Sequence, residues 1–283
     1  MASAPTEEII DTHTHVVSGD HERYPLNPRV LSPSQWYLDS PADAAKLKAA
    51  MDDSGVAQAI LVQGVGAYTF ENAYAMDAAK ETPDRFISAC CVDTEASDAV
   101  ASLDRWVNEG GAAGIRLFAI TREAHSWLSE ERTFPVWDRA AELGIHVIVT
   151  ILPHQLAELE SVLERFPSTP ISLDHCGFAL PDPGYRKALY ALARFPNLNL
   201  KLTTHGLDDA VKDEGSARPM VGELVDTFGA ERLMWGSDYC QIYDRPYSAL
   251  VDLARDAFQD LSSADRGAVF SGTAKRLWPS LNR

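Results

Sequence analysis

The chain has 283 residues, of which 46% are hydrophobic and 23% charged, a composition typical of a soluble globular protein with one large domain or two small ones. Its formal net charge of −16 argues against a nucleic-acid partner, because binding a phosphate backbone requires a positive surface. No apolar run reaches the ~20 residues that span a bilayer, and residues 1–8 lack the features of a signal peptide, so we expect a cytoplasmic protein with no membrane partner.

The first predicted element is a strand over residues 9–15, which ends in two histidines separated by one residue. Residues i and i+2 of a strand face the same side, so His13 and His15 leave it as a pair, about 7 Å apart along the backbone. Such a pair can hold a metal ion, although His-x-His pairs also occur on solvated loops. The carboxyl end of a buried strand is where α/β folds build active sites, which favours the first interpretation.

The longest predicted loop covers residues 16–40 and is rich in stiff and aromatic residues. These are Tyr24, Pro25, Pro28, Pro33, Trp36 and Tyr37. Loops longer than ~12 residues are commonly functional, which favours a lid over the active-site face. The alternative is a structural arm that packs on the wall of the domain.

Beyond residue 40, strand-length apolar runs alternate with helical patterns. With residues 9–15 the predicted strands number eight, the others being residues 57–63, 86–92, 113–118, 146–151, 170–175, 198–203 and 232–236. The predicted helices cover residues 41–54, 71–81, 96–109, 133–143, 154–166, 183–195, 216–229, 246–260 and 263–277. The first of them is expected to begin at the cap formed by Asp39 and Ser40 before Pro41, and to end at Gly55.

This alternation predicts an α/β protein, a single-domain (β/α)8 TIM barrel over residues 9–283 after a flexible N-terminus of residues 1–8. A doubly wound open sheet is the alternative fold. The glycine-rich phosphate turn that usually follows the first strand of such a sheet is missing from this sequence.

Polar residues capable of chemistry occur at the ends of four predicted strands. They are His13 and His15 in the first strand, Arg116 in the fourth, Asp174 and His175 in the sixth, and Asp238 after the eighth. Because the carboxyl ends of barrel strands converge, we expect one site. His13, His15 and Asp238 form a nitrogen and oxygen set suited to zinc or manganese, and His175 could add a ligand or act as an acid or base.

The motifs that carry these residues resemble those of the amidohydrolase superfamily, of the amidohydrolase-related (amidohydrolase 2) type. They read Ile-Asp-Thr-His-Thr-His, Gly-Ile-Arg, Leu-Asp-His-Cys-Gly and Trp-Gly-Ser-Asp-Tyr. The chain is similar to the branch of lactonases that act on sugar acids and on muconolactone or pyrone carboxylates, together with related metal-dependent decarboxylases. The resemblance covers nearly the whole chain, and the motifs in this order are specific.

The resemblance implies roles for individual residues. His13 and His15 match the metal or substrate pair of the first strand, His175 matches the histidine of the sixth, and Asp238 matches the general base that activates water. Arg116 and Arg122 match two arginines that hold a substrate carboxylate in the pyrone-carboxylate lactonases. Surface salt bridges are the alternative for both arginines, and Tyr239, beside Asp238, is a further candidate for substrate binding.

One position departs from the family pattern. Metal-dependent members carry a histidine at the end of strand five, where this chain has Thr150. His154, four residues later, could reach in as a ligand or substrate contact, or could simply start a helix. His205, after strand seven, is a second substitute, or lines the rim. Both a divalent metal and a metal-free mechanism therefore stay open.

We expect a hydrolase that opens a carboxylated lactone or a similar cyclic ester by attack of water on the acyl carbonyl. Asp238 would take the proton from water, while His13 and His15 polarise the carbonyl and His175 orients water or substrate. Arginine suits the clamping of a carboxylate because it donates paired hydrogen bonds.

Two alternatives compete with hydrolysis. Metal-dependent, non-oxidative decarboxylation of an aromatic or unsaturated acid would use the same residues, but the missing strand-five histidine weighs against it. A catalytically inactive barrel would have no physical need for such costly buried polar groups.

The expected partner is a small carboxylated molecule, and the sequence leaves open whether the chain forms a homo-oligomer. Cysteine usage fits the cytoplasm: Cys90, Cys91, Cys176 and Cys240 have no paired metal spacing, and their number suits a reduced compartment better than a disulfide framework. We interpret them as small packing residues.

Overall fold

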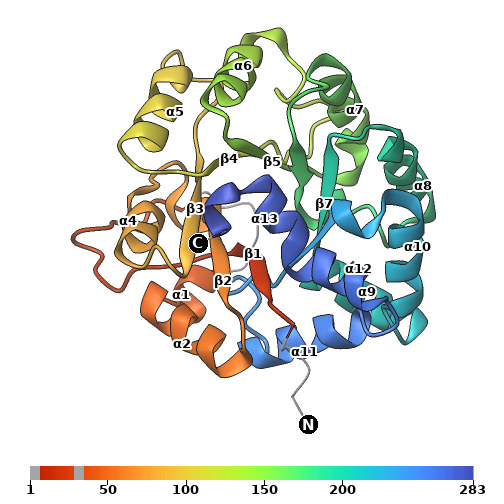
Figure 1. Cartoon of the computed structure of the whole chain (residues 1–283). Coiled ribbons are helices and arrows are strands. Elements are labelled where there is room, and N and C mark those ends of the chain that lie inside the picture. Colours follow the sequence, from red (N-terminus) through yellow and green to blue (C-terminus); the bar gives the residue numbers. More distant parts are fainter. Residues whose placement is uncertain (1–6, 29–34, 283) are drawn as a thin grey trace.

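Eight buried strands form one parallel sheet whose order follows the chain. They are β1 (Ile10–Thr14), β2 (Gln58–Val62), β3 (Phe86–Cys91), β4 (Gly114–Phe118), β5 (His146–Thr150), β6 (Ile171–Leu173), β7 (Leu198–Thr203) and β8 (Leu233–Gly236). The computed structural model describes residues 7–28 and 35–282, and Figure 1 shows the strands surrounded by a ring of helices.

The sheet closes where β1 meets the end of β8. Thr14 forms a parallel bridge with Tyr239, the backbone N–H of Asp238 donates to the carbonyl of His13 at 2.8 Å, and that of His15 donates to the carbonyl of Tyr239 at 2.6 Å. The side chain of Asp11 adds to the closure by accepting from the backbone N–H of Ser237 at 2.9 Å. The predicted (β/α)8 barrel is confirmed, and the open sheet is excluded.

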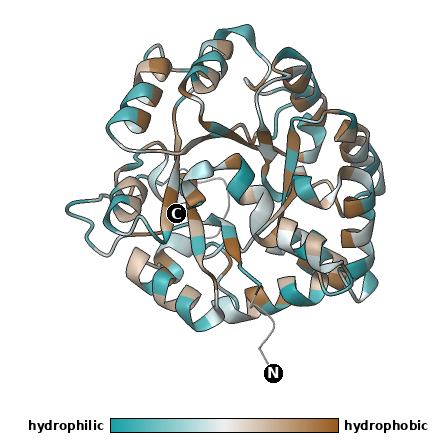
Figure 2. Ribbon diagram, in the orientation of Figure 1, coloured by the Kyte–Doolittle hydropathy of each residue, from teal (hydrophilic) through white to brown (hydrophobic). Residues whose placement is uncertain are grey.

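Helices accompany the strands, and most of them cover the outside of the sheet. They are α1 (Trp36–Asp39), α2 (Ala44–Ser54), α3 (Val65–Tyr68), α4 (Ala73–Glu81), α5 (Ala99–Asn108), α6 (Phe134–Leu143), α7 (Leu156–Arg165), α8 (Pro183–Ala191), α9 (Thr204–Glu214), α10 (Arg218–Phe228), α11 (Tyr247–Ala257), α12 (Ser263–Gly267) and α13 (Thr273–Leu277). Figure 2 shows hydrophilic and hydrophobic residues alternating along them, as expected for amphipathic helices. None of the helices among the described residues has both the length and the apolar character needed to cross a bilayer.

Three differences from the predicted elements have local causes. Helix α2 starts later than predicted, because Asp43 rather than Asp39 or Ser40 caps it by accepting from the N–H of Lys46 at 2.7 Å. Strand β6 ends at Leu173 instead of residue 175, because the backbone turns into the left-handed region at His175, with φ 55°. The predicted helix over 263–277 is interrupted by a π-helical turn at Ala268–Gly272.

Three helices are absent from the sequence-based prediction. The short α1 and α3 and the longer α9 fall in segments interpreted as loops. Helix α9 begins directly after β7 at Thr204 and contains Gly206, so a β-branched residue and a glycine conceal its first turn.

The described parts of the long loop, residues 16–28 and 35–40, contact α3: the N–H of Ser18 donates to the hydroxyl of Tyr68 at 2.8 Å, and that of Asn27 donates to the carbonyl of Ala67 at 2.9 Å. Tyr24, Trp36 and Tyr37 are buried, whereas Pro25 and Pro28 are exposed. Pro33 lies outside the described residues, as do residues 1–6 of the predicted flexible N-terminus. The indole of Trp36 packs 5.6 Å from the ring of His15, so this loop contributes directly to the carboxyl-terminal face of the barrel.

A separate apolar cluster fills the amino-terminal end of the barrel interior. It is formed by Ile10, Ile60, Val62, Ile87, Ala89, Ile148, Met234, Ala274, Trp278 and Leu281. The last three come from α13 and the segment after it, which lies across the centre of the barrel in Figure 1. This plug leaves the opposite face of the barrel for chemistry.

Candidate active site

Five of the side chains singled out from the sequence meet at the carboxyl ends of the strands. They are His13 and His15 from β1, His175 after β6, His205 in the first turn of α9 and Asp238 after β8. The rings of His13 and His15 lie 5.0 Å apart, and the ring of His175 lies 4.7 Å from that of His13. Apart from His205, whose side chain is 33% exposed, the cluster is buried.

Asp238 lies at the centre of this cluster. Its Oδ1 is 3.1 Å from Nε2 of His15 and 3.5 Å from Nε2 of His13, and its Oδ2 is 2.8 Å from Nε2 of His205. Burial acts to raise the pKa of Asp238, but its contacts with His15 and His205 outweigh burial and hold the pKa well below the usual range. Asp238 is therefore an ionised carboxylate surrounded by imidazoles.

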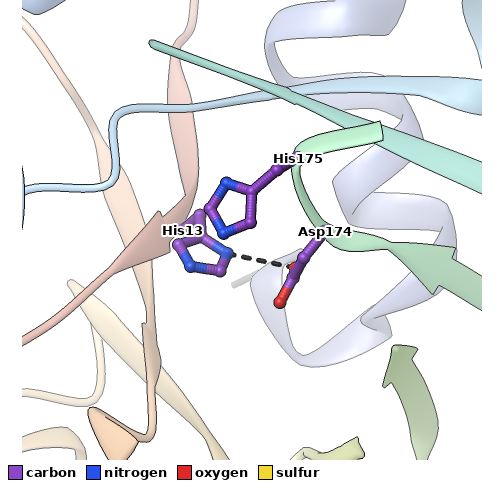
Figure 3. Close-up of side chains that lie close together, drawn as sticks. All are labelled: His13, Asp174 and His175. Carbon is purple, nitrogen blue, oxygen red and sulfur yellow. Dashed lines mark hydrogen bonds and ion pairs between the residues drawn. The ribbon is translucent and has the colours of Figure 1, made fainter. Parts of the chain in front are cut away.

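The hydrogen bonds of the strand-one histidines define their tautomers. Nδ1 of His15 lies 2.9 Å from the carbonyl oxygen of Val62, which can only accept, so this nitrogen carries a hydrogen. Nδ1 of His13 lies 3.1 Å from Oδ1 of Asp174, a contact drawn as a dashed line in Figure 3. Burial lowers the pKa of His13 to about 4, against the opposing charge of Asp174, so the ring is neutral at pH 7 and its Nε2 holds a lone pair.

This arrangement fits a cation. Nδ1 of each strand-one histidine faces an acceptor, so both Nε2 atoms point toward Oδ1 of Asp238, and three such ligand atoms are brought together favourably by a proton or a metal ion among them. The ligand atoms of His13, His15 and Asp238 all lie within 4.8 Å of one another, and Nε2 of His13 is buried without a hydrogen-bond partner among the described residues. Donation of the second ring N–H to a carboxylate or backbone carbonyl is characteristic of metal-binding histidines.

His175 lies beside His13, with its ring 4.7 Å from that of His13. Its Nδ1 lies 2.8 Å from Oγ1 of Thr203, and its ring stacks on Phe178 at 4.7 Å. Burial lowers the pKa of His175 well below the usual value, so the ring is neutral. His175 could join His205 and Asp238 in holding an ion, since their ligand atoms also lie within 4.8 Å of one another.

His205 makes the strongest contact with the second oxygen of Asp238. Burial acts to lower the pKa of His205, but the hydrogen bond to Asp238 outweighs it and the pKa is raised. His205 thus donates to Oδ2 and orients the carboxylate, whereas Oδ1 faces the strand-one histidines.

Arg116 and Thr150 lie within the barrel rather than on its rim. Arg116 is 4% exposed. Its Nε lies 2.9 Å from Oγ1 of Thr150 and 3.1 Å from Oδ2 of Asp174. Its Nη1 donates to the carbonyl of Gln63 at 3.1 Å. Thr150 in turn donates to Oδ2 of Asp174 at 2.7 Å. The residue that replaces the strand-five histidine therefore takes part in a hydrogen-bond network around Asp174, and Nη2 of Arg116 lies outside these bonds.

Two predicted contacts lie away from the cluster, and a third, Tyr239, directly follows Asp238 in the chain. Arg122 is exposed in the loop after β4, and His154 is exposed before α7, where its Nε2 donates to the carbonyl of Glu123 at 3.0 Å. His154 belongs to none of the candidate metal groups found among the described residues. Tyr239 is buried and packs 5.2 Å from the ring of Tyr247.

Two charged residues of the barrel interior had no role in the sequence-based reasoning. Asp11 ties β1 to β8, and Lys201 of β7 is fully buried with its Nζ 3.2 Å from Oδ1 of Asp174. A signal for Lys201 exists in the strand itself: Asn199, Lys201 and Thr203 alternate with three leucines, which places the polar residues on the face opposite to the outer core.

Comparisons with known proteins agree with this architecture. A family model described as "Amidohydrolase" matches residues 10–280. The chain is 28% identical over 195 residues to the L-fucono-1,5-lactonase of Burkholderia ambifaria, a match that covers 66% of this chain. It spans 64% and 66% of the lengths of the first two curated relatives that it matches.

Solved structures show the same fold. One is a "probable 2-pyrone-4,6-dicarboxylic acid hydrolase" from Acinetobacter baumannii with citric acid bound, with a TM-score of 0.76, 18% identity and coverage of 96% of this chain and 99% of that one. Another is an amidohydrolase from Burkholderia multivorans with bound zinc, with a TM-score of 0.73, 23% identity and the same two coverages.

Proposed function

The chain belongs to the amidohydrolase family, and on this premise we propose that it is a hydrolase that opens a carboxylated lactone or a similar cyclic ester. The observation that carries the proposal is the buried Asp238 carboxylate, approached on both oxygens by imidazoles at 2.8 and 3.1 Å. An ionised carboxylate held in this way is suited to removing a proton from water. The names of the lactonase and pyrone-dicarboxylate hydrolase relatives support the choice of a lactone.

In the proposed reaction Asp238 accepts a proton as water attacks the acyl carbonyl, and a carbon–oxygen bond forms to give a tetrahedral oxyanion. His13 and His15 lie beside Oδ1 of Asp238, where their Nε2 atoms would hold a cation that stabilises the developing charge, while His175 orients water or substrate. The ring carbon–oxygen bond then breaks, and the proton held by Asp238 passes to the departing oxygen. The product is an open-chain hydroxy acid.

We further propose that His13, His15 and Asp238 hold a divalent ion, zinc or manganese, with His175 as an additional ligand. The ligand atoms of His13, His15 and Asp238 converge, which supports this assignment, as does the zinc in the amidohydrolase from Burkholderia multivorans. When bound, such an ion supplies a Lewis acid that polarises the lactone carbonyl. Metal analysis of protein purified without added ions tests the assignment; full activity with a stoichiometry near zero would refute it.

The substrate carboxylate is proposed to meet Arg122 and Arg116, whose Nη2 takes part in none of the bonds given above, because paired hydrogen bonds from arginine match a carboxylate. His205 and Tyr239 are proposed to line the same site. His154, which bonds to the carbonyl next to Arg122, is proposed to contact the substrate from the loop.

Incubation with L-fucono-1,5-lactone and with 2-pyrone-4,6-dicarboxylate tests the proposal, with acid release followed in a weakly buffered indicator solution. We expect release from at least one of them, and none from protein carrying Asp238→Asn. Release of carbon dioxide from aromatic carboxylic acids, without lactone opening, would instead favour the decarboxylase.

We also propose that the protein acts in the cytoplasm on a small molecule, and that it has no nucleic-acid partner. The low number of cysteines, all four of them buried, supports the first statement, and the net charge of −16 supports the last.

A further inference from the structure

A fully buried lysine lies inside the barrel, and the proposed hydrolysis does not use it. Lys201 belongs to β7, and its side chain has no exposed surface. Its Nζ lies 5.8 Å from the ring centroid of Trp278, in the plug of the barrel. Lysine is almost never fully buried without a charged partner, because removing an ammonium group from water is costly.

The partner of Lys201 is the carboxylate of Asp174, which it shares with Arg116. Nζ of Lys201 lies 3.2 Å from Oδ1, and Nε of Arg116 lies 3.1 Å from Oδ2. Oδ2 also accepts a hydrogen bond from Thr150 at 2.7 Å. Lysine and arginine side chains can only donate hydrogen bonds, so both oxygens of Asp174 act as acceptors.

The same carboxylate determines how His13 carries its proton. Oδ1 of Asp174 lies 3.1 Å from Nδ1 of His13 (Figure 3). Because Oδ1 also faces the donating Nζ of Lys201, it acts as an acceptor toward His13, and the contact requires a hydrogen on Nδ1. In the neutral ring the lone pair is then on Nε2, which lies 3.5 Å from Oδ1 of Asp238. The opposite tautomer would place a hydrogen there and remove that lone pair from the reaction centre.

We propose that Lys201 is a positioning residue: together with Arg116 it keeps Asp174 a pure acceptor, which fixes the Nδ1–H tautomer of His13 and leaves Nε2 free toward the reaction centre. The catalytic consequence rests on the proposed function, because that is where His13 acquires its role. The tautomer itself does not depend on any activity.

The first test uses the unmodified full-length protein labelled with ¹⁵N-histidine. Long-range ¹H–¹⁵N correlation spectra distinguish a protonated from an unprotonated ring nitrogen, and His13→Gln assigns the signals. We expect His13 to be protonated at Nδ1 and unprotonated at Nε2. A hydrogen on Nε2 with a bare Nδ1 would overturn the proposal, whether or not a lactone is turned over.

The second test is a double-mutant cycle on the lactone that the protein opens. Lys201→Met should lower kcat about tenfold with KM nearly unchanged, and Asp174→Asn about 100-fold, as is usual for residues that orient a site histidine. In the Asp174→Asn background, Lys201→Met should have no further effect on kcat, because it acts through that carboxylate. Independent, multiplicative effects would contradict the proposal.

A matched control is available in the same barrel interior. Ser172 lies 2.6 Å from Nε2 of His146, a buried hydrogen bond in which the carboxylate of Asp174 takes no part. Ser172→Ala should leave kcat within about twofold, and its effect should combine independently with that of Lys201→Met. A tenfold loss from Ser172→Ala would show that any disturbance of the interior has this effect, and the positioning role of Lys201 would be rejected.

Discussion

Asp238 combines burial, charge and an unfavourable backbone conformation. Its carboxylate is fully buried and its φ is 60°, in the left-handed region where residues other than glycine carry ~1 kcal/mol of strain or more. His175 has a similar φ of 55°. Strain of this kind at two residues of one cluster is typical of a functional site rather than of a core.

We expect Asp238→Asn to lower kcat by about 10³ or more, because the amide keeps the shape of the side chain but cannot accept the proton. Asparagine tolerates the left-handed region, so the fold should persist. Kinetics and a thermal melt followed by circular dichroism measure the two effects. Asp43→Asn, at the cap of α2, is the matched control and should alter neither. An Asp238→Asn variant with near-normal kcat would exclude this residue as the base.

The two arginines should respond differently to substitution. Arg122 is exposed, so Arg122→Ala should raise KM for a carboxylated lactone about tenfold or more and leave an uncharged lactone unaffected. Arg116 is buried against Asp174, so Arg116→Ala should also destabilise the fold by about 3 kcal/mol. KM measurements on both lactones and urea unfolding separate the cases. Equal effects of Arg122→Ala on both lactones would argue against a carboxylate clamp.

For single residues, the position in the chain could be predicted from the sequence, but the contacts could not. The positions of His13, His15 and Asp238 at strand ends could be predicted from the pattern of buried strands. The interaction partners of the site residues could not be predicted in this way. The exposure of His154 and the burial of Arg116, for example, depend on how the loops after β4 and β5 pack. Lys201 was missed for the same reason, since its partner Asp174 lies on another strand.

At the level of elements, hydrophobic periodicity located every strand, because strands of a parallel barrel are buried along their whole length. It failed where backbone conformation decides the boundary. Strand β6 stops at Leu173 because the next residues turn left-handed, and α9 starts immediately after β7 with a glycine in its first turn. Neither feature changes the apolar pattern.

The glycines of α3 and α10 allow a comparison between elements. A Cβ on Gly66 would lie 3.1 Å from Nε1 of Trp36, the residue that packs on His15, whereas a Cβ on Gly222 would meet no atom within 4 Å. We expect Gly222→Ala to stabilise the protein by about 0.5–1 kcal/mol, since alanine is the better helix former. Gly66→Ala should lack this gain and should lower kcat by displacing Trp36. Urea unfolding and kinetics of the two variants test this. Equal stabilisation of the protein by both substitutions would show that the Trp36 side chain moves aside without energetic cost.

At the level of the whole molecule, the barrel could be predicted because eight strands and the intervening helices leave few ways to bury so many apolar faces. The closure of its amino-terminal end was not predicted. The amino-terminal end is filled by Trp278 and Leu281, which come from the last residues of the chain. The opposite end collects the histidines and Asp238, so stability and chemistry are divided between the two faces.

This division predicts the effect of Trp278→Ala. The indole is 1% exposed and packs 4.3 Å from the ring of His146. It also lies so close to β4 that a Cβ added to Gly114 would be only 3.2 Å from it. Loss of the indole therefore leaves a cavity that the rigid strands cannot fill. We expect a loss of about 3–5 kcal/mol in the free energy of unfolding, measured with urea, and a smaller loss for Trp278→Phe. Tyr185→Ala, at a 40% exposed side chain, should change stability by less than about 0.5 kcal/mol. If Trp278→Ala were equally harmless, the C-terminal segment would not be the plug that closes the barrel.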